Sequence, residues 1–143
     1  MLQLTNSLIL KRKCQIIVSS PDGKKSICVD LEIKEQLLAY IRQSDRHKKK
    51  WNHIVELLMG GHRNSELYDK EEINDKCKGV TAMKFFKGQE NDRIYCKEQS
   101  MPDGLFIIVT AEIYPKKKTQ KVSKKEIPII EKIGQYEYQI EEP

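Results

Sequence analysis

The stretch Leu105-Phe106-Ile107-Ile108-Val109 decides the fold, because it is continuously apolar in a chain that is otherwise rich in charge. A strand with one face in water alternates apolar and polar residues, so this run indicates a strand that is covered on both faces. It predicts a central strand over Leu105–Ile113, with helices on one of its faces. The core is expected to be densest there.

Two strand-like segments, Val80–Lys87 and Asp92–Glu98, come shortly before the apolar run. Gly88-Gln89-Glu90-Asn91 separates them, and Met101-Pro102-Asp103-Gly104 leads into the run. Both links have lengths that suit hairpins. The three segments therefore predict an antiparallel meander.

An earlier part of the chain has a hairpin pattern. Cys14–Val18 and Ser26–Ile33 are strand-like, and the turn signal Pro21-Asp22-Gly23 joins them. The period then changes to that of helices, first at Ile33, Leu37, Leu38 and Ile41, and then at Trp51, Ile54, Val55, Leu58 and Met59. Gly60-Gly61 ends the second helix. Trp51 is expected in the core, and a pocket lined by it is the alternative.

The polar face of the second helix carries a basic cluster near its beginning, made of Arg46, Lys48, Lys49 and Lys50. The dipole of a helix favours acidic residues at this end. Local stability therefore does not explain the cluster.

The remaining segments are less regular. Residues 62–78 are polar and predict a loop with a short helical turn around Asp69–Asn74. Ser123-Lys124-Lys125-Glu126 is a capping box that predicts a C-terminal helix, although Pro128 indicates an irregular or shifted start. Tyr136–Ile140 alternates and predicts a short final strand or an extended tail.

These elements predict an α+β fold, an antiparallel β-sheet with two N-terminal-side helices packed on it and a C-terminal helix. The length of 143 residues suits a single domain over residues 1–143. No apolar run approaches the roughly 20 residues of a membrane-spanning helix. The basic residues follow the apolar start of the chain, which is the wrong order for a secretory signal, so a cytoplasmic protein with no membrane partner is expected.

The cysteines and histidines do not predict a metal site. The four cysteines are far apart and form no C-x-x-C pair, and the spacing of His47, His53 and His62 places no two on adjacent turns of one helix face. No metal and no cofactor are expected.

The formal net charge of +5 is unevenly distributed. Six lysines fall within the ten residues 116–125, whereas the C-terminal residues are acidic. Such a cluster favours a polyanionic partner, and a solvated face that aids solubility is the alternative.

A compound pattern within Met83–Ile133 is more specific than any single motif. It contains Phe85-Phe86-Lys87-Gly88, Asp92-Arg93-Ile94-Tyr95, the apolar strand at Phe106–Ile113, Lys117-Lys118-Thr119-Gln120-Lys121, and Ser123-Lys124-Lys125-Glu126-Ile127. In these features the chain resembles the HigB-like branch of the RelE/ParE superfamily of toxins. The resemblance is strongest over residues 79–133, and residues 1–25 are an extra N-terminal strand region.

The resemblance implies a RelE-like fold and the toxin component of a type II toxin–antitoxin system. Family members are endoribonucleases that cleave mRNA, free or on the ribosome, and a small antitoxin neutralises them. A metal-independent endoribonuclease, a hydrolase of RNA, is therefore expected. The alternatives are a degenerate toxin that binds RNA or protein without cleavage, and a gyrase-directed toxin, because a fold does not choose an activity.

Alternation along Asp92–Glu98 places Arg93, Tyr95 and Lys97 on one face of the strand. The resemblance implies that Arg93 grips the scissile phosphate; a surface salt bridge to Asp92 or Glu112 is the structural alternative. The candidate catalytic residues are Arg93, Tyr95 and Lys118. The candidate RNA-binding residues are Lys84, Lys87, Lys97, Lys116, Lys117 and Lys121. No histidine follows His62, which leaves the general acid and base open.

Overall fold

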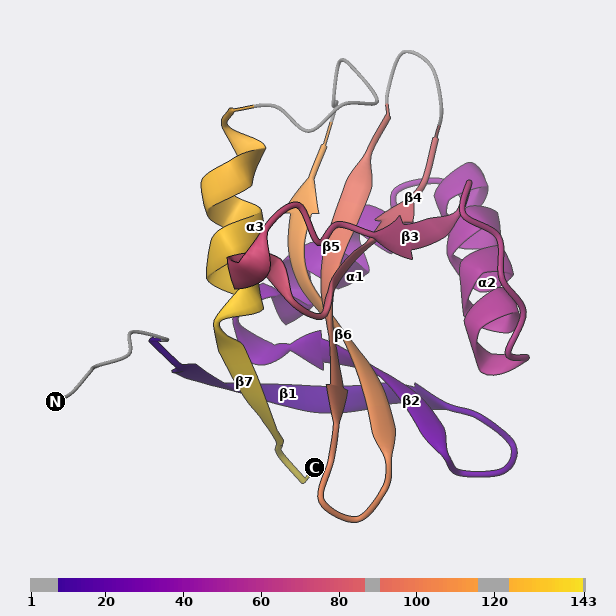
Figure 1. Ribbon diagram of the computed structural model, residues 1–143. Coiled ribbons are helices and arrows are strands. Elements are labelled where there is room, and N and C mark those ends of the chain that lie inside the picture. The colour runs from indigo at the N-terminus through magenta and orange to yellow at the C-terminus, as the bar shows by residue number, and fades with distance from the viewer. Residues whose placement is uncertain (1–7, 87–90, 116–123, 143) are drawn as a thin grey trace, which may run out of the picture.

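The computed structural model describes residues 8–86, 91–115 and 124–142. Within them, one mixed sheet has the strand order β3-β4-β5-β6-β2-β1-β7 (Figure 1). The strands are β1 Leu10–Ser19, β2 Lys25–Asp30, β3 Tyr68–Lys70, β4 Val80–Lys84, β5 Arg93–Ser100, β6 Phe106–Tyr114 and β7 Tyr136–Ile140. The helices are α1 Lys34–Arg42, α2 Asp45–Met59 and α3 Glu126–Gly134, with 3-10 turns at Leu31–Ile33 (η1) and Asp75–Cys77 (η2).

Strand β6 lies at the centre of the sheet, as the apolar run predicts. Ile108 belongs to the core cluster that α1 and α2 complete, whereas Ile107 and Val109 belong to a second cluster that α3 and β7 complete. The helical pair and α3 thus cover opposite faces of the sheet (Figure 1). Trp51 packs in the first cluster, which confirms its expected core position.

The expectation of an antiparallel sheet is wrong at two junctions. The β1–β2 hairpin and the β4–β5–β6 meander are antiparallel, as expected. However, β2 pairs in parallel with β6, and β1 pairs in parallel with β7. Parallel neighbours require long connections. Here α1, α2, β3, β4 and β5 separate β2 from β6 along the chain, so the local residue pattern did not reveal which strands would meet.

Helix α2 begins and ends at recognisable caps. The Ser44 side chain accepts a hydrogen bond from the His47 N–H, and the His62 N–H donates to the Leu57 carbonyl after the last turn. Gly61 has φ of +73°, which a residue without a Cβ adopts at little cost. The Gly60-Gly61 stop is therefore confirmed, and the basic cluster of α2 lies in its first two turns.

The expected helical turn at Asp69–Asn74 is wrong. Tyr68–Lys70 forms the edge strand β3, antiparallel to β4, and the helical turn η2 starts only at Asp75. Pairing with Thr81–Met83 outweighs the weak local preference of this polar segment.

Helix α3 begins two residues later than the capping box implies, because Lys125 occupies the N-cap position; Ser123 lies outside the described residues. Pro128 then falls in the first turn, where its missing N–H is not needed. A Cβ on Gly134 would lie 1.9 Å from the carbonyl oxygen of Lys76, so glycine allows α3 to approach η2. Tyr136–Ile140 is a strand, which decides between the two expectations for it.

Candidate functional site

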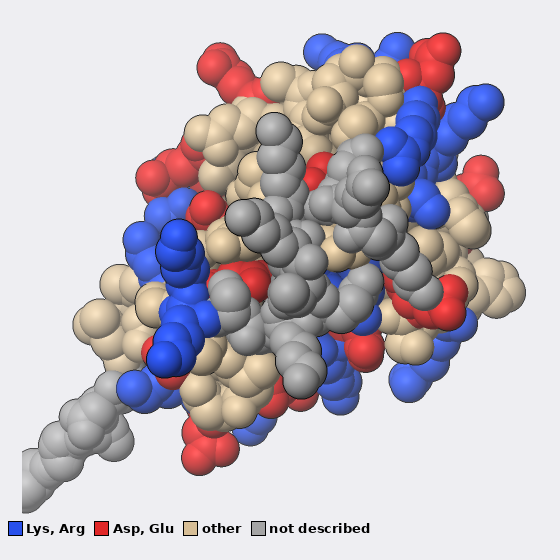
Figure 2. Space-filling model, turned by 90° about the horizontal axis from the view of Figure 1, so that it is seen from above, with Lys and Arg blue, Asp and Glu red and all other residues tan. Residues whose placement is uncertain are grey.

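Several elements begin or end at one end of the sheet, drawn uppermost in Figure 1: β4 and β6 end there, and β5, α2 and α3 begin there. Arg93 is the first residue of β5, between its register partners Lys84 on β4 and Tyr114 on β6. Seen from above, lysine and arginine side chains gather in separate groups around this end (Figure 2).

Arg93 and Tyr95 lie on one face of β5, as alternation predicts, because Tyr95 packs in the α3 cluster and Ile94 in the α1–α2 cluster. This face is buried. Arg93 is only 3% exposed, and its guanidinium is 3.0 Å from a carboxylate oxygen of Glu71. The salt bridge to Glu71 is therefore internal, whereas the sequence suggested a surface partner, Asp92 or Glu112.

Glu71 reaches Arg93 because it follows β3 directly and its N–H donates to the Val80 carbonyl. The residue is 9% exposed. Burial raises the pKa of the Glu71 carboxyl, and the attraction of Arg93 only partly offsets this effect. A carboxylate with a raised pKa beside a cation is a common arrangement at proton-transfer sites.

A second buried pair adjoins the first. The Tyr95 hydroxyl donates to the Glu126 carboxylate, and both side chains are fully buried. Burial, and then this hydrogen bond, raise the pKa of Tyr95. The negative charge of Glu126 also raises the pKa of Glu71, so the two pairs form one electrostatic unit. We call Glu71, Arg93, Tyr95 and Glu126 the Arg93 cluster.

Sequence reasoning missed both carboxylates of this cluster. Glu126 was assigned to a helix cap, and Glu71 was placed in a loop of no assigned role. The only local signal for Glu126 was Pro128, which indicated a shifted helix start and hence a glutamate free to turn inward. Nothing near Glu71 in the sequence indicated its contact with Arg93.

Of the other described candidates, Lys84 lies beside the Arg93 cluster as the register partner of Arg93, and its charge also lowers the pKa of Glu71, whereas Lys97 lies apart from the cluster. The amino group of Lys84 donates to the Ser65 carbonyl and lies 3.8 Å from the Asp69 carboxylate. Lys97 lies four residues along β5 from Arg93, about 13 Å away at the rise of a strand, so the structure does not bring the two together. The remaining candidates, Lys87, Lys116, Lys117, Lys118 and Lys121, lie outside the described residues.

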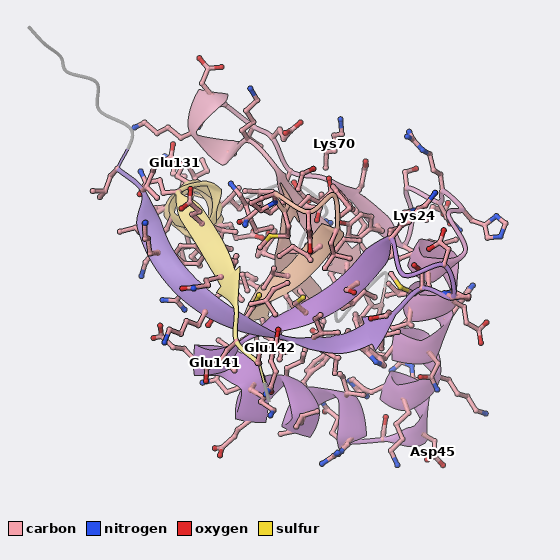
Figure 3. All side chains as sticks on the ribbon, turned by 90° about the horizontal axis from the view of Figure 1, so that it is seen from below. Lys24, Asp45, Lys70, Glu131, Glu141 and Glu142 are labelled. Atoms are coloured by element: carbon pink, nitrogen blue, oxygen red, sulfur yellow. The ribbon has the colours of Figure 1, made fainter. Side chains whose placement is uncertain are left out.

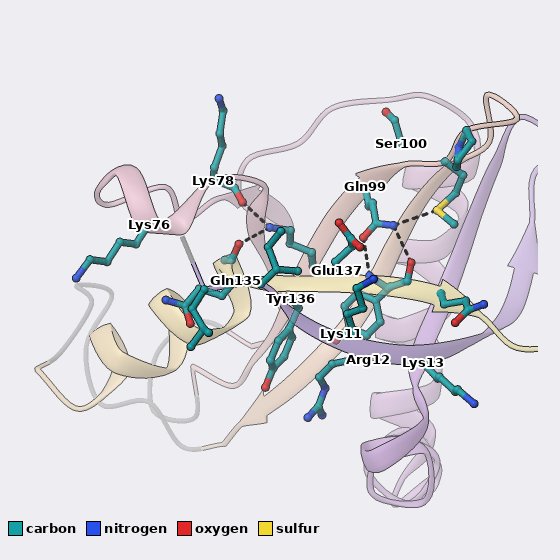
Figure 4. Close-up of a pocket in the computed structure, with 18 of the residues that line it drawn as sticks. Lys11, Arg12, Lys13, Lys76, Lys78, Gln99, Ser100, Gln135, Tyr136 and Glu137 are labelled. Carbon is teal, nitrogen blue, oxygen red and sulfur yellow. Dashed lines mark hydrogen bonds between the residues drawn. The ribbon is translucent and has the colours of Figure 1, made fainter. Parts of the chain in front are cut away.

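Lys97 instead lines an open hollow of about 1140 Å³ beside β7. Its amino group donates to the carbonyls of Lys78 and Gly134, and burial lowers the pKa of that amine (Figure 4). Gln99 lies nearby and binds the backbone of Tyr138. These polar groups hold α3 and β7 in place.

Within the described residues, no three His, Cys, Asp or Glu side chains are arranged to hold a metal ion, and no helix is both long and apolar enough to cross a membrane. Comparisons with protein-family models, with curated proteins and with solved structures find no match for this chain.

Proposed function

We propose that this chain is a metal-independent endoribonuclease that acts on mRNA, as the toxin component of a toxin–antitoxin system. The observation that carries the proposal is the Arg93 cluster, which joins an arginine to a carboxyl of raised pKa at one end of a β-meander. The order of strand, two helices, three-stranded meander and C-terminal helix agrees with the RelE/HigB-like resemblance. A small antitoxin and the ribosome are the partners that this resemblance implies.

The cluster contains the groups that RNA cleavage requires. Glu71 would take the proton of a ribose 2′-OH, whose oxygen then bonds to phosphorus while the bond to the 5′-oxygen breaks. Arg93 would stabilise the charge on the phosphate, which its planar guanidinium suits. Tyr95, the hydroxyl of the cluster, would supply the proton for the departing 5′-oxygen and would regain one from Glu71, which returns both groups to their starting states.

Because Arg93 is buried against Glu71, an RNA phosphate would reach its guanidinium only by displacing the Glu71 carboxylate. A phosphate has to replace the Glu71 carboxylate at the guanidinium, and this exchange releases Glu71 to act as a base. The Glu71–Arg93 ion pair is thus a resting arrangement in this proposal.

The test is induced expression in bacterial cells of the wild type, Arg93→Ala, Arg93→Lys and Glu71→Gln, with new 5′ ends mapped in cellular mRNA. The exposed Arg63→Ala is the matched control. We expect growth arrest and new 5′ ends with the wild type and the control, and neither with Arg93→Ala or Glu71→Gln. Because Arg93 is buried, circular dichroism of each purified variant has to establish folding.

Arrest without new 5′ ends would contradict the proposal and indicate gyrase or another target. Repeating the cleavage assay with purified protein, with and without ribosomes, determines whether cleavage requires the ribosome.

A non-catalytic RNA- or protein-binding module is the second candidate. It is favoured by the burial of Arg93 and Tyr95, since each already has a carboxylate partner. This candidate predicts that labelled RNA shifts in a gel with the purified protein and remains intact.

A further inference from the structure

The first two turns of α2 border an open hollow of about 600 Å³, which lies apart from the Arg93 cluster. Its lining consists of Arg46, Lys49, Lys50, His53 and Phe86. Thus three cations and a histidine surround one aromatic ring. The volume lies within the usual range for small-ligand sites.

The aromatic ring and one of the cations are stacked. The Arg46 guanidinium lies 3.8 Å from the centre of the Phe86 ring. His47 holds that ring from the side, with 4.9 Å between the two ring centres and an edge-to-face angle. Phe86 is 7% exposed, whereas Arg46 is exposed, so the stack presents a flat cation toward solvent. Nucleobases stack on such arginine planes.

Lys49 and Lys50 add further positive charge to the hollow. Within the described residues, neither lysine forms an ion pair, whereas Lys48 lies 3.9 Å from the Asp45 carboxylate. The dipole of α2 adds positive potential at the same place and makes these cations unfavourable for the isolated helix. An anionic ligand would offset the repulsion between these lysines and the positive end of the helix dipole.

The start of α2, which borders the hollow, and the start of β5, which carries Arg93, lie at the same end of the molecule (Figure 1). Phe86 of the hollow packs in the α1–α2 core and Tyr95 packs in the α3 core, so the two places are on opposite faces of the sheet. The Tyr40 hydroxyl on α1 donates to the Asp92 carboxylate at 2.6 Å, next to Arg93. The helical pair is therefore fixed to the start of β5, and one nucleic-acid strand passing over this end could contact both places.

We propose that this hollow binds one nucleotide of single-stranded RNA, with Lys49 and Lys50 at its phosphate and the Arg46–Phe86 stack against its base. The inference rests on the proposed function, because RNA is taken as the ligand. It adds a second contact that positions the RNA strand and takes no part in cleavage.

The experiment uses a fluorescein-labelled, fully 2′-O-methylated oligonucleotide of about 12 residues, which spans a single-strand binding site of ordinary size. This probe lacks the 2′-OH, so it reports binding without cleavage. Fluorescence anisotropy is measured over a series of salt concentrations for the wild type and for Lys49→Glu/Lys50→Glu. The control is Lys24→Glu/Arg63→Glu, which lowers the net charge equally.

The control positions lie away from the hollow. Lys24 is in the turn between β1 and β2, and Arg63 follows the end of α2, about 22 Å along the helix from its start. Figure 3 labels Lys24 in that turn and Asp45 at the start of α2.

We expect Lys49→Glu/Lys50→Glu to weaken binding about tenfold or more and to lower the salt dependence by about one phosphate contact for each lysine. The control should change affinity less than about threefold. Arg46→Lys keeps the charge but loses the planar stack, and should also weaken binding. Circular dichroism of every variant has to match the wild type.

Equal weakening by both double variants would overturn the inference, because binding would then follow net charge alone. Wild-type affinity in Lys49→Glu/Lys50→Glu would overturn it as well, and would leave the proposed function intact. Failure of the wild type to bind the probe would overturn the inference, whereas the proposed function is judged by the RNA ends mapped in cells. Binding by Arg93→Ala without cleavage in cells would support both and separate the two contacts.

Discussion

At the scale of single residues, the Arg93 cluster shows how burial changes the chemistry of ordinary side chains. Glu71 and Glu126 are unremarkable in the sequence, but in the structure each carboxylate lies against a buried partner, Arg93 or Tyr95. Because both pairs are buried, breaking either one should lower the free energy of unfolding strongly, since the remaining polar group is left without water and without a partner.

Changing Tyr95 to Phe should lower the free energy of unfolding by about 1–3 kcal/mol, because the buried Glu126 carboxylate loses a donor. Urea denaturation at neutral pH measures this loss. The half-buried Tyr114, with its ring 6.4 Å from that of Tyr95, provides the control Tyr114→Phe, for which we expect a smaller loss. Equal losses for the two variants would contradict the assigned hydrogen bond.

Glu71→Gln should reveal the raised pKa of Glu71 through pH dependence. The Glu71 carboxyl keeps its proton above pH 4.5 in the folded protein but loses it there in the unfolded chain. The protonated carboxyl therefore stabilises the fold fully below pH 4.5, and this contribution is lost as pH rises through the folded-state pKa. The unfolding free energy of the wild type relative to Glu71→Gln should therefore fall above about pH 4.5. Denaturation from acid to neutral pH checks this, with the exposed Glu35→Gln as control. A constant difference would refute it.

At the scale of elements, β7 is held by more than its pairing with β1. The side-chain amide of Gln99 on β5 donates to the Tyr138 carbonyl and accepts from the Tyr138 N–H, both at 2.8 Å (Figure 4). The Tyr138 hydroxyl donates to the buried Asp30 on β2. A single glutamine thus replaces a neighbouring strand along part of β7.

Gln99→Leu should therefore loosen β7 without unfolding the sheet. The Tyr138 amide should exchange its hydrogen faster, by an amount that corresponds to about 1–3 kcal/mol in opening free energy, because its partner is gone. Protection along β5 and β6 should persist. Hydrogen exchange read by NMR measures both, and Gln139→Leu, an exposed change on β7, is the control. Unchanged exchange at Tyr138 would rule out this role for Gln99.

At the scale of the whole molecule, two cores share one sheet. Ile54 on α2 and Ile130 on α3 are fully buried on its opposite faces. Truncation of either to alanine should cost about 2–5 kcal/mol. Since β6 contributes side chains to both cores, unfolding should remain one transition in either variant.

This coupling between the two cores is tested by comparing the unfolding midpoints that two spectroscopic signals report. Trp51 fluorescence reports the α1–α2 core, and far-ultraviolet circular dichroism reports the whole chain. Separate midpoints for the two probes in Ile130→Ala would show that the cores unfold independently and would contradict the prediction.

The sequence by itself determined most of the elements. The apolar run at Leu105–Val109 predicted the central strand, helical spacing predicted α1 and α2, and alternation placed Arg93 and Tyr95 on one face. These properties repeat every two or 3.6 residues, so neighbouring residues are enough to reveal them. The resemblance to toxins also came from the sequence, and it stays a proposal.

Only the tertiary structure decided which elements meet. It joined β2 to β6 in parallel, brought Glu71 and Glu126 to Arg93 and Tyr95, and left Lys97 at a different hollow. It also stacked Arg46 on Phe86, far apart in the chain. Such contacts depend on burial and packing between distant segments, and a residue pattern that reports only its own neighbourhood does not contain them.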